Sequence, residues 1–512
     1  MADLARSNSF LENSSTRTIL SQVIAVSVKN FLLFVTGMSS AYPTILIPAL
    51  TTESNFQLDN EGISWIGSTN LMCALIGCSL SGIITQPFGR KRFMQIATVP
   101  IMVSWLIFKF ANQMWEIYFA LALYGLSSGF IEAPVLSYVA EITQPRVRGM
   151  LSATGTLSSV AGVLVGFFLG TVLVWRDVAI VSSVVPVVAF CLLCFIPESP
   201  HWLIMRNRLD DAQKSLAWLR GWINVENVKE EFEEICRNHN TSCQTGDANV
   251  LTISEAPSSA STRNNIMVMV RPYIQKNFLW PFSLVLFICF LCGFTGFLTL
   301  QTYAVGIFSS LHVPINEYYA TLGLGIAQFV GSLVSVVLVK CLGKRVMTFI
   351  SLGFIGVCNL VIGVYGHQTN VNNLNLAPGN VSNTHIEISD HQWVPLVFLV
   401  LLSFFGHCGI RVLPWIILGE IYSYKTRAVG CGLSSALYYI FGFLGNKVFL
   451  RMIDLLTLPG VYWFYSLVSF VGLFIMYFVL PETEGKPLQE IIDHFSGISK
   501  LDNKIRKLPP AP

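Results

Sequence analysis

Long apolar stretches alternate with short polar connections along the whole chain. Each stretch holds roughly 20 residues with few charges, the length that a helix needs to cross a hydrocarbon layer of about 30 Å. This pattern predicts membrane-spanning helices and an all-α membrane protein. Twelve spans can be placed, with cores at 22–46, 63–85, 93–111, 117–140, 151–173, 178–196, 278–303, 318–339, 346–366, 393–419, 429–450 and 458–480.

The polar connections between these spans repeat in one order in the two halves of the chain. The first half carries Gly89-Arg90-Lys91-Arg92, then Glu141 with Arg148 seven residues later, then Pro197-Glu198-Ser199. The second half carries Gly343-Lys344-Arg345, then Glu420 with Arg427 seven residues later, then Pro481-Glu482-Thr483. Such a repeat predicts two pseudo-symmetric six-helix bundles, an architecture typical of secondary transporters.

These repeated polar motifs indicate how the chain is organised. We expect a cytoplasmic tail, a first bundle, a cytoplasmic linker with short helices, a second bundle and a second cytoplasmic tail. Their respective ranges are 1–18, 19–196, 197–276, 277–480 and 481–512.

Composition and charge agree with a membrane protein and orient it. Of 512 residues only 12% are charged, half of the roughly 25% found in soluble domains. With the N-terminus inside, 27 of the 32 Lys and Arg residues lie on the cytoplasmic side and four lie outside or at outer helix ends. Because cytoplasmic loops carry the basic excess, both termini are predicted to be cytoplasmic.

Two longer polar segments interrupt the pattern. The linker 197–276 has helical spacing of apolar residues between Arg208 and Arg220, whereas 240–264 is rich in Ser, Thr and Asn and is predicted to be disordered. Residues 367–392 lie outside in this orientation and contain the sequon at Asn380, so glycosylation is expected there.

Several classes of function are disfavoured by the same residues. A net charge of +3 with scattered basic residues does not indicate a nucleic-acid partner. The glycine-rich stretches lie within apolar helices rather than between a strand and a helix, so no nucleotide loop is indicated. The C-x-x-C spacings at 191–194 and 289–292 lack neighbouring His or acidic residues. We therefore expect no metal, no cofactor and no enzymatic activity.

The motifs together resemble the sugar-porter branch of the major facilitator superfamily, and most closely the facilitated trehalose transporters of insects and their relatives. Gly82-x-x-x-Gln86-x-x-Gly89-Arg90-Lys91 resembles the loop between helices 2 and 3, and Glu141-x-x-x-Pro145-x-x-Arg148-Gly149 the end of helix 4. Pro197-Glu198-Ser199 and Pro481-Glu482-Thr483 resemble the signatures after helices 6 and 12. The resemblance covers nearly the whole chain.

The resemblance implies a gate of ion pairs at the cytoplasmic ends of the bundles. Arg90, Glu141 and Arg148 are expected to form one cluster and Arg345, Glu420 and Arg427 the other, with Glu198 and Glu482 joining them. Ion pairs at exposed positions contribute only about 0–1 kcal/mol each, so several can bias one conformation without fixing it. Ordinary anchoring by basic residues is the alternative, although it does not explain the paired glutamates.

At the positions where the family binds sugar, this chain departs from the pattern. Positions that usually carry amides in the family are here occupied by Ser159, Cys292, Gly293, Leu298 and Tyr438. From the resemblance and from the spacing of polar residues within the spans, we expect seven residues to bind substrate: Gln328, Trp415, His407, Arg411, Tyr303, Tyr438 and Glu132.

His407, Arg411 and Trp415 follow one another at intervals of four residues and are predicted to share one helix face. Glu132 lies nine residues before Glu141, and Arg411 lies nine residues before Glu420. Nine residues extend about 13 Å along a helix, so the two charges are expected at equivalent depths in the two bundles. One hypothesis pairs these two charges across the cavity, directly or through substrate. Local solvation of each charge and attraction of an anionic substrate by Arg411 are the alternatives.

The overall prediction is a monomeric, multi-pass plasma-membrane uniporter of a small carbohydrate, trehalose or a hexose, working by alternating access. The first span lacks the acid that proton symporters of the family carry there, so facilitated diffusion is favoured. A proton-coupled carrier, an organic-anion carrier of the same fold and a non-transporting nutrient sensor remain alternatives.

Overall fold

The computed structural model describes residues 2–53, 56, 58–244, 273–376, 391–418, 421–422, 426–486 and 488–502. Within these ranges the side chains of 2–15, 145, 146, 148, 149, 238–244, 340, 427, 428, 488, 489 and 492 are also left undescribed, those of Arg148 and Arg427 among them. The predictions for Asn380, for Glu420, for the side chains of Arg148 and Arg427, and for the polar segment beyond residue 244 therefore lie outside the described part of the chain.

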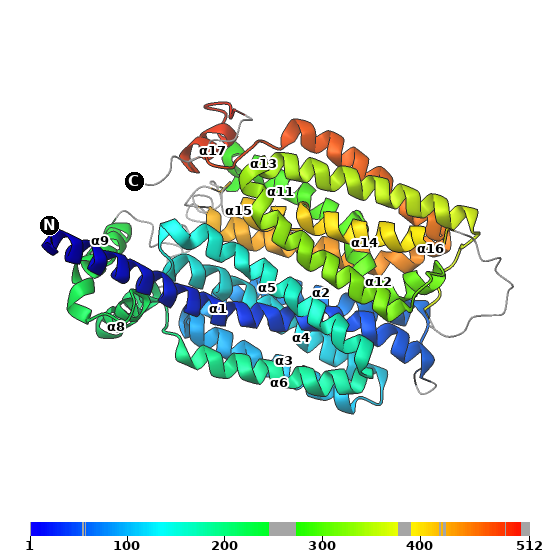
Figure 1. Ribbon diagram of the computed structural model, residues 1–512, viewed down its shortest axis with the longest axis horizontal. Helices are drawn as coiled ribbons and strands as arrows, with labels where there is room; N and C mark the ends of the chain where they lie inside the picture. The colour runs from blue at the N-terminus through cyan, green and yellow to red at the C-terminus, as the bar shows by residue number, and fades with distance from the viewer. Residues whose placement is uncertain are drawn as a thin grey trace, which may run out of the picture.

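The first half forms six long helices that lie alongside one another (Figure 1). Local signals set their ends: the Gly62 N–H donates to the Asp59 side chain ahead of α2, and Pro145 occupies the first turn of α5, where no helical N–H is required. The helices are α1 (Ala2–Thr52), α2 (Asn60–Phe88), α3 (Arg90–Phe110), α4 (Met114–Ile142), α5 (Pro145–Val172) and α6 (Trp175–Phe195).

Small residues bring the helices of this half into close contact. A Cβ atom on Gly125 of α4 would lie 2.2 Å from the Asn70 carbonyl oxygen of α2, and one on Gly129 would lie 2.2 Å from that of Ala74. The backbones can approach this closely only because neither position has a side chain. The spacing of these two glycines therefore fixes the packing of α2 against α4.

Short helices follow the first half: α7 (Pro200–Met205), α8 (Leu209–Leu219), the 3-10 turn η1 (Val225–Val228) and α9 (Lys229–Gln244). They bury a small apolar core of their own around Trp202, Leu216 and Phe232. Ser21 of α1 donates to the Leu219 carbonyl oxygen over 2.8 Å, which ties this helical group to the first half. The amphipathic spacing predicted between Arg208 and Arg220 corresponds to α8.

The second half repeats the arrangement with two interrupted spans. The first apolar run after the linker forms α11 (Lys276–Phe294) and α12 (Phe297–Ser310), which are separated at Gly296, where φ is +88°. The remaining helices are α13 (Glu317–Gln368), α14 (Trp393–Cys408), α15 (Leu413–Leu418), α16 (Arg427–Val479) and α17 (Leu488–Phe495). Non-helical backbone at Gly343 and Thr457 divides α13 and α16 into two helices each.

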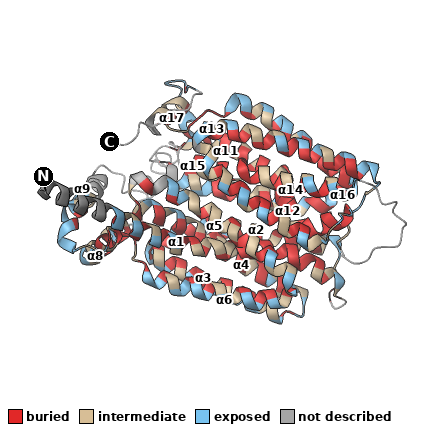
Figure 2. Ribbon diagram, viewed as in Figure 1, coloured by how far each residue is buried: buried red, intermediate tan, exposed pale blue. Residues whose placement is uncertain are grey.

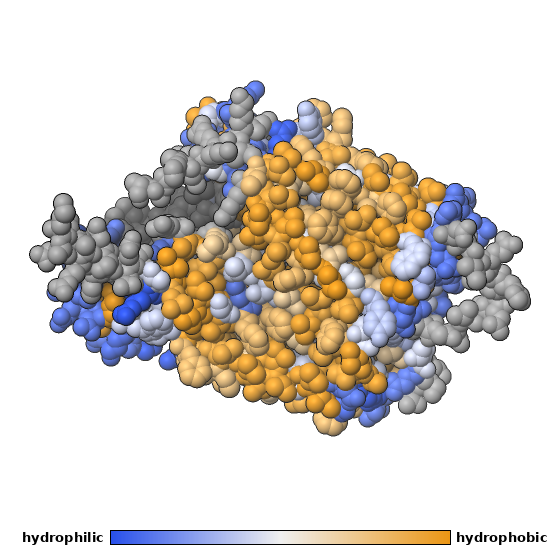
Figure 3. All heavy atoms as spheres, in the orientation of Figure 1, coloured by the Kyte–Doolittle hydropathy of each residue, from blue (hydrophilic) through white to orange (hydrophobic). Residues whose placement is uncertain are grey.

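The surface and the helix lengths agree with a membrane protein. The face drawn in Figure 3 is apolar across the middle of the molecule and carries hydrophilic residues toward both ends. Eleven described segments are long and apolar enough to cross a membrane, and one of them, Val429–Val479, contains the interruption at Thr457. Its 51 residues would extend about 76 Å as one helix, so it accounts for two crossings and the total reaches the predicted twelve.

Candidate functional site

The two ends of the bundle carry different polar groups. We call the end that bears α7–α9 and α17 the linker end and the opposite one, where α2 and α4 begin, the far end (Figure 1). At the linker end of the first half, Arg90 forms an ion pair with Glu141 over 2.8 Å, and Ser199 donates a hydrogen bond to the same carboxylate. Glu198 accepts hydrogen bonds from the backbone N–H groups of Arg90 and Lys91 at 3.0 and 2.9 Å.

The linker end of the second half repeats this geometry. Glu482 accepts from the backbone N–H groups of Lys344 and Arg345 at 3.1 and 3.0 Å. A glycine with positive φ precedes the capped helix in both halves, Gly89 at +91° and Gly343 at +78°. The carboxylate lies at the positive end of the helix dipole in each case, which stabilises it there. The repeated motifs thus build one structural unit twice.

Arg345 does not occupy the place of Arg90 in this repeat. The residue directly after the glycine is Lys344, which is 4% exposed and pairs with Glu484 over 3.0 Å. Arg345 donates to the Tyr477 carbonyl oxygen and packs on the Phe349 and Tyr477 rings. The register after the glycine therefore makes Lys344, rather than Arg345, the counterpart of Arg90.

At the far end, charged groups join the two halves to each other. Glu61 at the start of α2 pairs with Lys447 over 2.5 Å and with Arg451 over 3.1 Å, both from the second half. The Lys447 ammonium also lies 3.9 Å from the centre of the Trp65 ring, a cation–π distance. We call Glu61, Trp65, Lys447 and Arg451 the far-end lock.

Neutral groups extend the far-end contact inward. Asn446 donates to the Gly67 carbonyl oxygen over 2.9 Å, and Thr44 of α1 donates to that of Gln301 over 2.6 Å. Tyr303, a substrate-binding candidate, lies in this contact: its hydroxyl donates to the Asn446 carbonyl oxygen over 3.2 Å and its ring stacks on Phe449. The halves are therefore joined at the far end, with Tyr303 part of the joint.

The tenth span is broken at mid-depth, which corrects the predicted single helix face. α14 ends at Cys408 and α15 begins at Leu413, so His407, Arg411 and Trp415 do not lie on one continuous helix. Pro414 causes the interruption because it has no N–H to donate to the Ile410 carbonyl oxygen four residues earlier. Cys292 of α11 makes a contact of 3.3 Å with that oxygen instead.

The break separates the substrate-binding candidates of the second half into two groups. Arg411, Tyr438 and Trp415 form one group, and His407 and Gln328 form the other. Arg411 lies in the break, with its guanidinium 5.2 Å from the centre of the Tyr438 ring, and that ring packs on Trp415 with centroids 5.4 Å apart. His407 is buried in the second half, where its Nδ1 lies 3.0 Å from the Ser403 carbonyl oxygen. Gln328 donates to the Ser403 hydroxyl over 3.2 Å.

Several polar atoms of these groups are buried without a partner among the described residues. They are Nη1 of Arg411, the hydroxyl of Tyr438 and Oε1 of Gln328. An unmatched buried polar group costs about 1–3 kcal/mol, so such atoms favour a ligand that can complete their hydrogen bonds. Aromatic faces beside free donors and acceptors suit a polar ligand with an apolar ring face.

Among the described residues, Glu132 takes part in the only hydrogen bond that joins the two halves at mid-depth. Tyr439 of α16 donates to its carboxylate over 3.2 Å. Arg411 forms no direct ion pair with Glu132 among the described contacts, although the two charges interact electrostatically. Lys29 of α1, which is 2% exposed, is a second cation that interacts electrostatically with Glu132.

Sequence reasoning missed Lys29, Tyr439 and the far-end lock. The predicted orientation counts Lys29 among the cytoplasmic cations, although it lies within the predicted first span 22–46. A cation within a membrane span usually marks a functional site, and this position could have indicated one. Lys447 and Arg451 are two of the four basic residues that the predicted orientation places outside or at outer helix ends, but their partner Glu61 belongs to the other half of the chain. Nothing in local spacing indicates that contact, because it depends on how the two halves close.

These features define the class of protein. Duplicated six-helix bundles, broken helices at mid-depth and buried polar atoms that have no partner among the described residues are the arrangement of a secondary transporter. The sequence profile of the "Sugar (and other) transporter" family matches residues 19–495, so the chain belongs to that family. It is thus a member of a family of transporters and not of enzymes, as the motifs predicted.

Individual relatives and solved structures agree with this assignment. The chain is 27% identical over 494 residues to a facilitated trehalose transporter Tret1 of Polypedilum vanderplanki, covering 96% of this chain and 91% of the relative. It is also 27% identical to a protein of the same name from Bombyx mori, with 92% and 86% covered. The fold is similar to a partially occluded, inward-open structure of the xylose transporter XylE from E. coli, with a TM-score of 0.69, 17% identity and 91% and 99% of the two chains covered. The predicted major facilitator fold is therefore confirmed.

Proposed function

We propose that this chain is a facilitative transporter of a small neutral carbohydrate, trehalose or a hexose, in the plasma membrane. The linker end and both termini are cytoplasmic in this proposal, and the protein acts as a monomer. The observation that carries it is the set of buried polar atoms of Arg411, Tyr438 and Gln328 that have no partner in the described part of the chain. The names of the relatives, facilitated trehalose transporters, support the substrate class.

Transport follows from the way the halves are joined. With the far-end lock formed, the site is closed on that side, and substrate exchanges with the linker side. A sugar leaving water must replace its hydrogen bonds, which the amide of Gln328 and the hydroxyl of Tyr438 can do, while Trp415 covers an apolar ring face. Opening of the far-end lock and closure of the linker end then expose the site to the other side.

Radiolabelled sugar flux into proteoliposomes tests the proposal. Trehalose and glucose uptake should saturate, should stop when the internal and external concentrations are equal, and should not accumulate in response to an imposed pH gradient. Accumulation driven by the gradient would instead establish the proton-coupled alternative. Binding of sugar without any flux would establish the nutrient sensor.

Two tryptophans of the tenth span provide a matched pair of variants. Trp415 packs on Tyr438, whereas Trp393 at the start of α14 is 56% exposed on the surface. Trp415→Ala should lower sugar uptake at least tenfold, and Trp393→Ala should leave it near that of the unchanged protein. Equal uptake by both variants would contradict the placement of the site.

One observation favours a second candidate, a carrier of organic anions. Arg411 and Lys29 supply two cations near one anion, Glu132, and a guanidinium nitrogen of Arg411 has no described partner. Counterflow with a panel of monocarboxylates and sugars separates the two candidates. Arg411→Leu should abolish anion exchange if the substrate is an anion, and should weaken sugar exchange less severely if it is a neutral sugar.

A further inference from the structure

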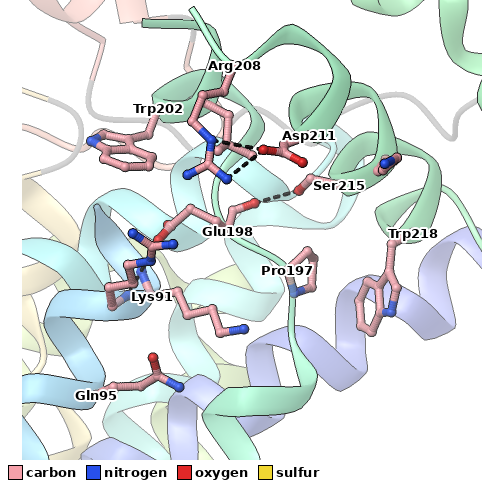
Figure 4. Close-up of a pocket in the computed structure, with 12 residues that line it drawn as sticks. Lys91, Gln95, Pro197, Glu198, Trp202, Arg208, Asp211, Ser215 and Trp218 are labelled. Carbon is pink, nitrogen blue, oxygen red and sulfur yellow. Dashed lines mark hydrogen bonds and ion pairs between the residues drawn. The ribbon is translucent and has the colours of Figure 1, made fainter. Parts of the chain in front are cut away.

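A pocket of about 360 Å³ lies at the linker end, away from the mid-depth site. It is formed where α3 begins, where the chain leaves α6 and where α8 crosses above them. Figure 4 shows Lys91 and Gln95 on one side of the pocket and Trp218 on the other, with Pro197 and Glu198 between them. A pocket of this size accommodates a small polar group.

The pocket has an excess of positive charge. Its lining contains four cations, Lys91, Arg92, Arg208 and Lys214, and two acids. Both acids are engaged by other groups: Glu198 caps the first turn of α3, and Asp211 pairs with Arg208 over 2.5 Å. Asp211 offsets Arg208, and the single charge of Glu198 stands against the three remaining cations, so the lining keeps a net charge of +2.

Two cations are available to a ligand. Among the described residues, the side chains of Arg92 and Lys214 are exposed and have no hydrogen-bond or ion-pair partner. Lys91 donates to the Cys194 carbonyl oxygen at the end of α6 over 3.0 Å, so its ammonium is held at the lower edge of the pocket with further donor capacity. Three cations from two helices around one concave space favour a phosphate ligand.

The surroundings place this pocket at the edge of an apolar part of the surface. Figure 2 shows exposed positions along the outer faces of α3 and α6. Among them, Ile96, one turn beyond Arg92 on α3, is 50% exposed, and Phe195, the last residue of α6, is 76% exposed. On α8 and just beyond it, Leu209 and Trp222 are also nearly half exposed, and Trp222 packs edge-on against Trp218. Tryptophans and exposed apolar residues beside cations are typical of a membrane–water interface.

We propose that this pocket binds the phosphate headgroup of an anionic phospholipid from the adjoining leaflet. A soluble phosphate compound shares the phosphate chemistry, but the exposed apolar side chains of Phe195 and Leu209, which lie within two residues of the lining residues Pro197 and Arg208, suit acyl chains and add nothing to the binding of a soluble anion. The site uses the charges of Arg92 and Lys214, which the transport site at mid-depth does not use. Anionic lipid of the cytoplasmic leaflet is the occupant.

The test uses the full chain in micelles of a neutral detergent. Short-chain dioctanoyl phosphatidylinositol 4-phosphate, dioctanoyl phosphatidylcholine and free inositol 1,4-bisphosphate are titrated, and binding is measured by thermophoresis. The anionic lipid should bind at least tenfold more tightly than either other probe. Equal binding of the two lipids would overturn the proposal, and so would binding of the free inositol phosphate as tight as that of the anionic lipid.

Charge variants assign the binding to the pocket. Lys214→Glu and Arg92→Gln should each weaken binding of the anionic lipid about fivefold or more, the change that corresponds to about 1 kcal/mol per basic residue near an anionic surface. Lys214→Arg keeps the charge and should bind normally. Lys229→Glu makes the same charge change on exposed Lys229 of α9, outside the pocket, and should also bind normally. Loss of affinity in Lys229→Glu equal to that in Lys214→Glu would overturn the assignment.

Discussion

The linker end and the far end use similar charged groups for opposite purposes. At the linker end, Glu198 and Glu482 bond to groups of their own half. At the far end, Glu61 pairs with Lys447 and Arg451 of the other half. Bonds within a half make each bundle rigid, whereas bonds between halves hold one conformation. Substitutions at the linker end should therefore lower stability, and those at the far end should shift the conformational equilibrium.

Loss of the buried carboxylate of Glu482 should have the largest effect. Glu482→Ala leaves the backbone N–H groups of Lys344 and Arg345 without their acceptor in a buried place, at a cost of about 2–4 kcal/mol. The apparent melting temperature in detergent should fall clearly, as measured by tryptophan fluorescence. Glu226→Ala, which alters an exposed acid of η1, is the control and should melt as the unchanged protein does. An unchanged melting temperature in Glu482→Ala would contradict the role in stability.

The mid-depth bond between the halves should come next. Tyr439→Phe removes the hydrogen bond to the Glu132 carboxylate, a bond to a charged group worth about 1.5–3 kcal/mol. Because this bond joins the halves, deuterium exchange in the far-end segments 60–71 and 440–452 should rise. Exchange at the linker end of α4 serves as the internal reference and should stay constant. Faster exchange at both ends would indicate a general loss of stability instead.

The far-end lock should respond more weakly. Glu61→Gln removes two partly exposed ion pairs, which contribute little in water, so the equilibrium constant for closure of the far end should fall several-fold. Faster deuterium exchange at 60–71 with an unchanged melting temperature is the expected result. High salt should produce part of the same change in the unaltered protein, because it screens exposed charges. Equal exchange in the two proteins at low salt would show that the lock does not hold the halves.

The smallest effect concerns α17 at the linker end. Partial burial against Trp280 lowers the pKa of His494 from its usual 6.5, so the folded protein favours the neutral imidazole. The associated stability is present above about pH 6.5 and decreases as the pH falls toward the folded-state pKa. The protection of 488–495 against deuterium exchange, corrected for the intrinsic exchange rate at each pH, should fall between pH 7.5 and 5.5, and His494→Gln should remove that dependence. The same pH response in His494→Gln would assign it to another group.

The sequence predicted the spans well because membrane crossing depends on local composition. Every predicted core lies largely within an observed helix or helix pair, and the motifs marked the units around Glu198 and Glu482. The site was predicted less completely. The break before Pro414 means that His407, Arg411 and Trp415 do not share one helix face, and the proline in the sequence could have indicated this break. The Glu132–Tyr439 bond and the far-end lock join residues more than 300 positions apart, and only the closed arrangement of the halves brings them together.

Reversible cross-linking across the far end tests the rocking of the two halves most directly. Glu61→Cys and Lys447→Cys place thiols on residues whose side chains are in contact across the halves. A short, reducible cross-linker should abolish sugar flux in the double variant, reductant should restore it, and neither single variant should respond. Undiminished flux through the cross-linked protein would contradict alternating access by opening of the far end.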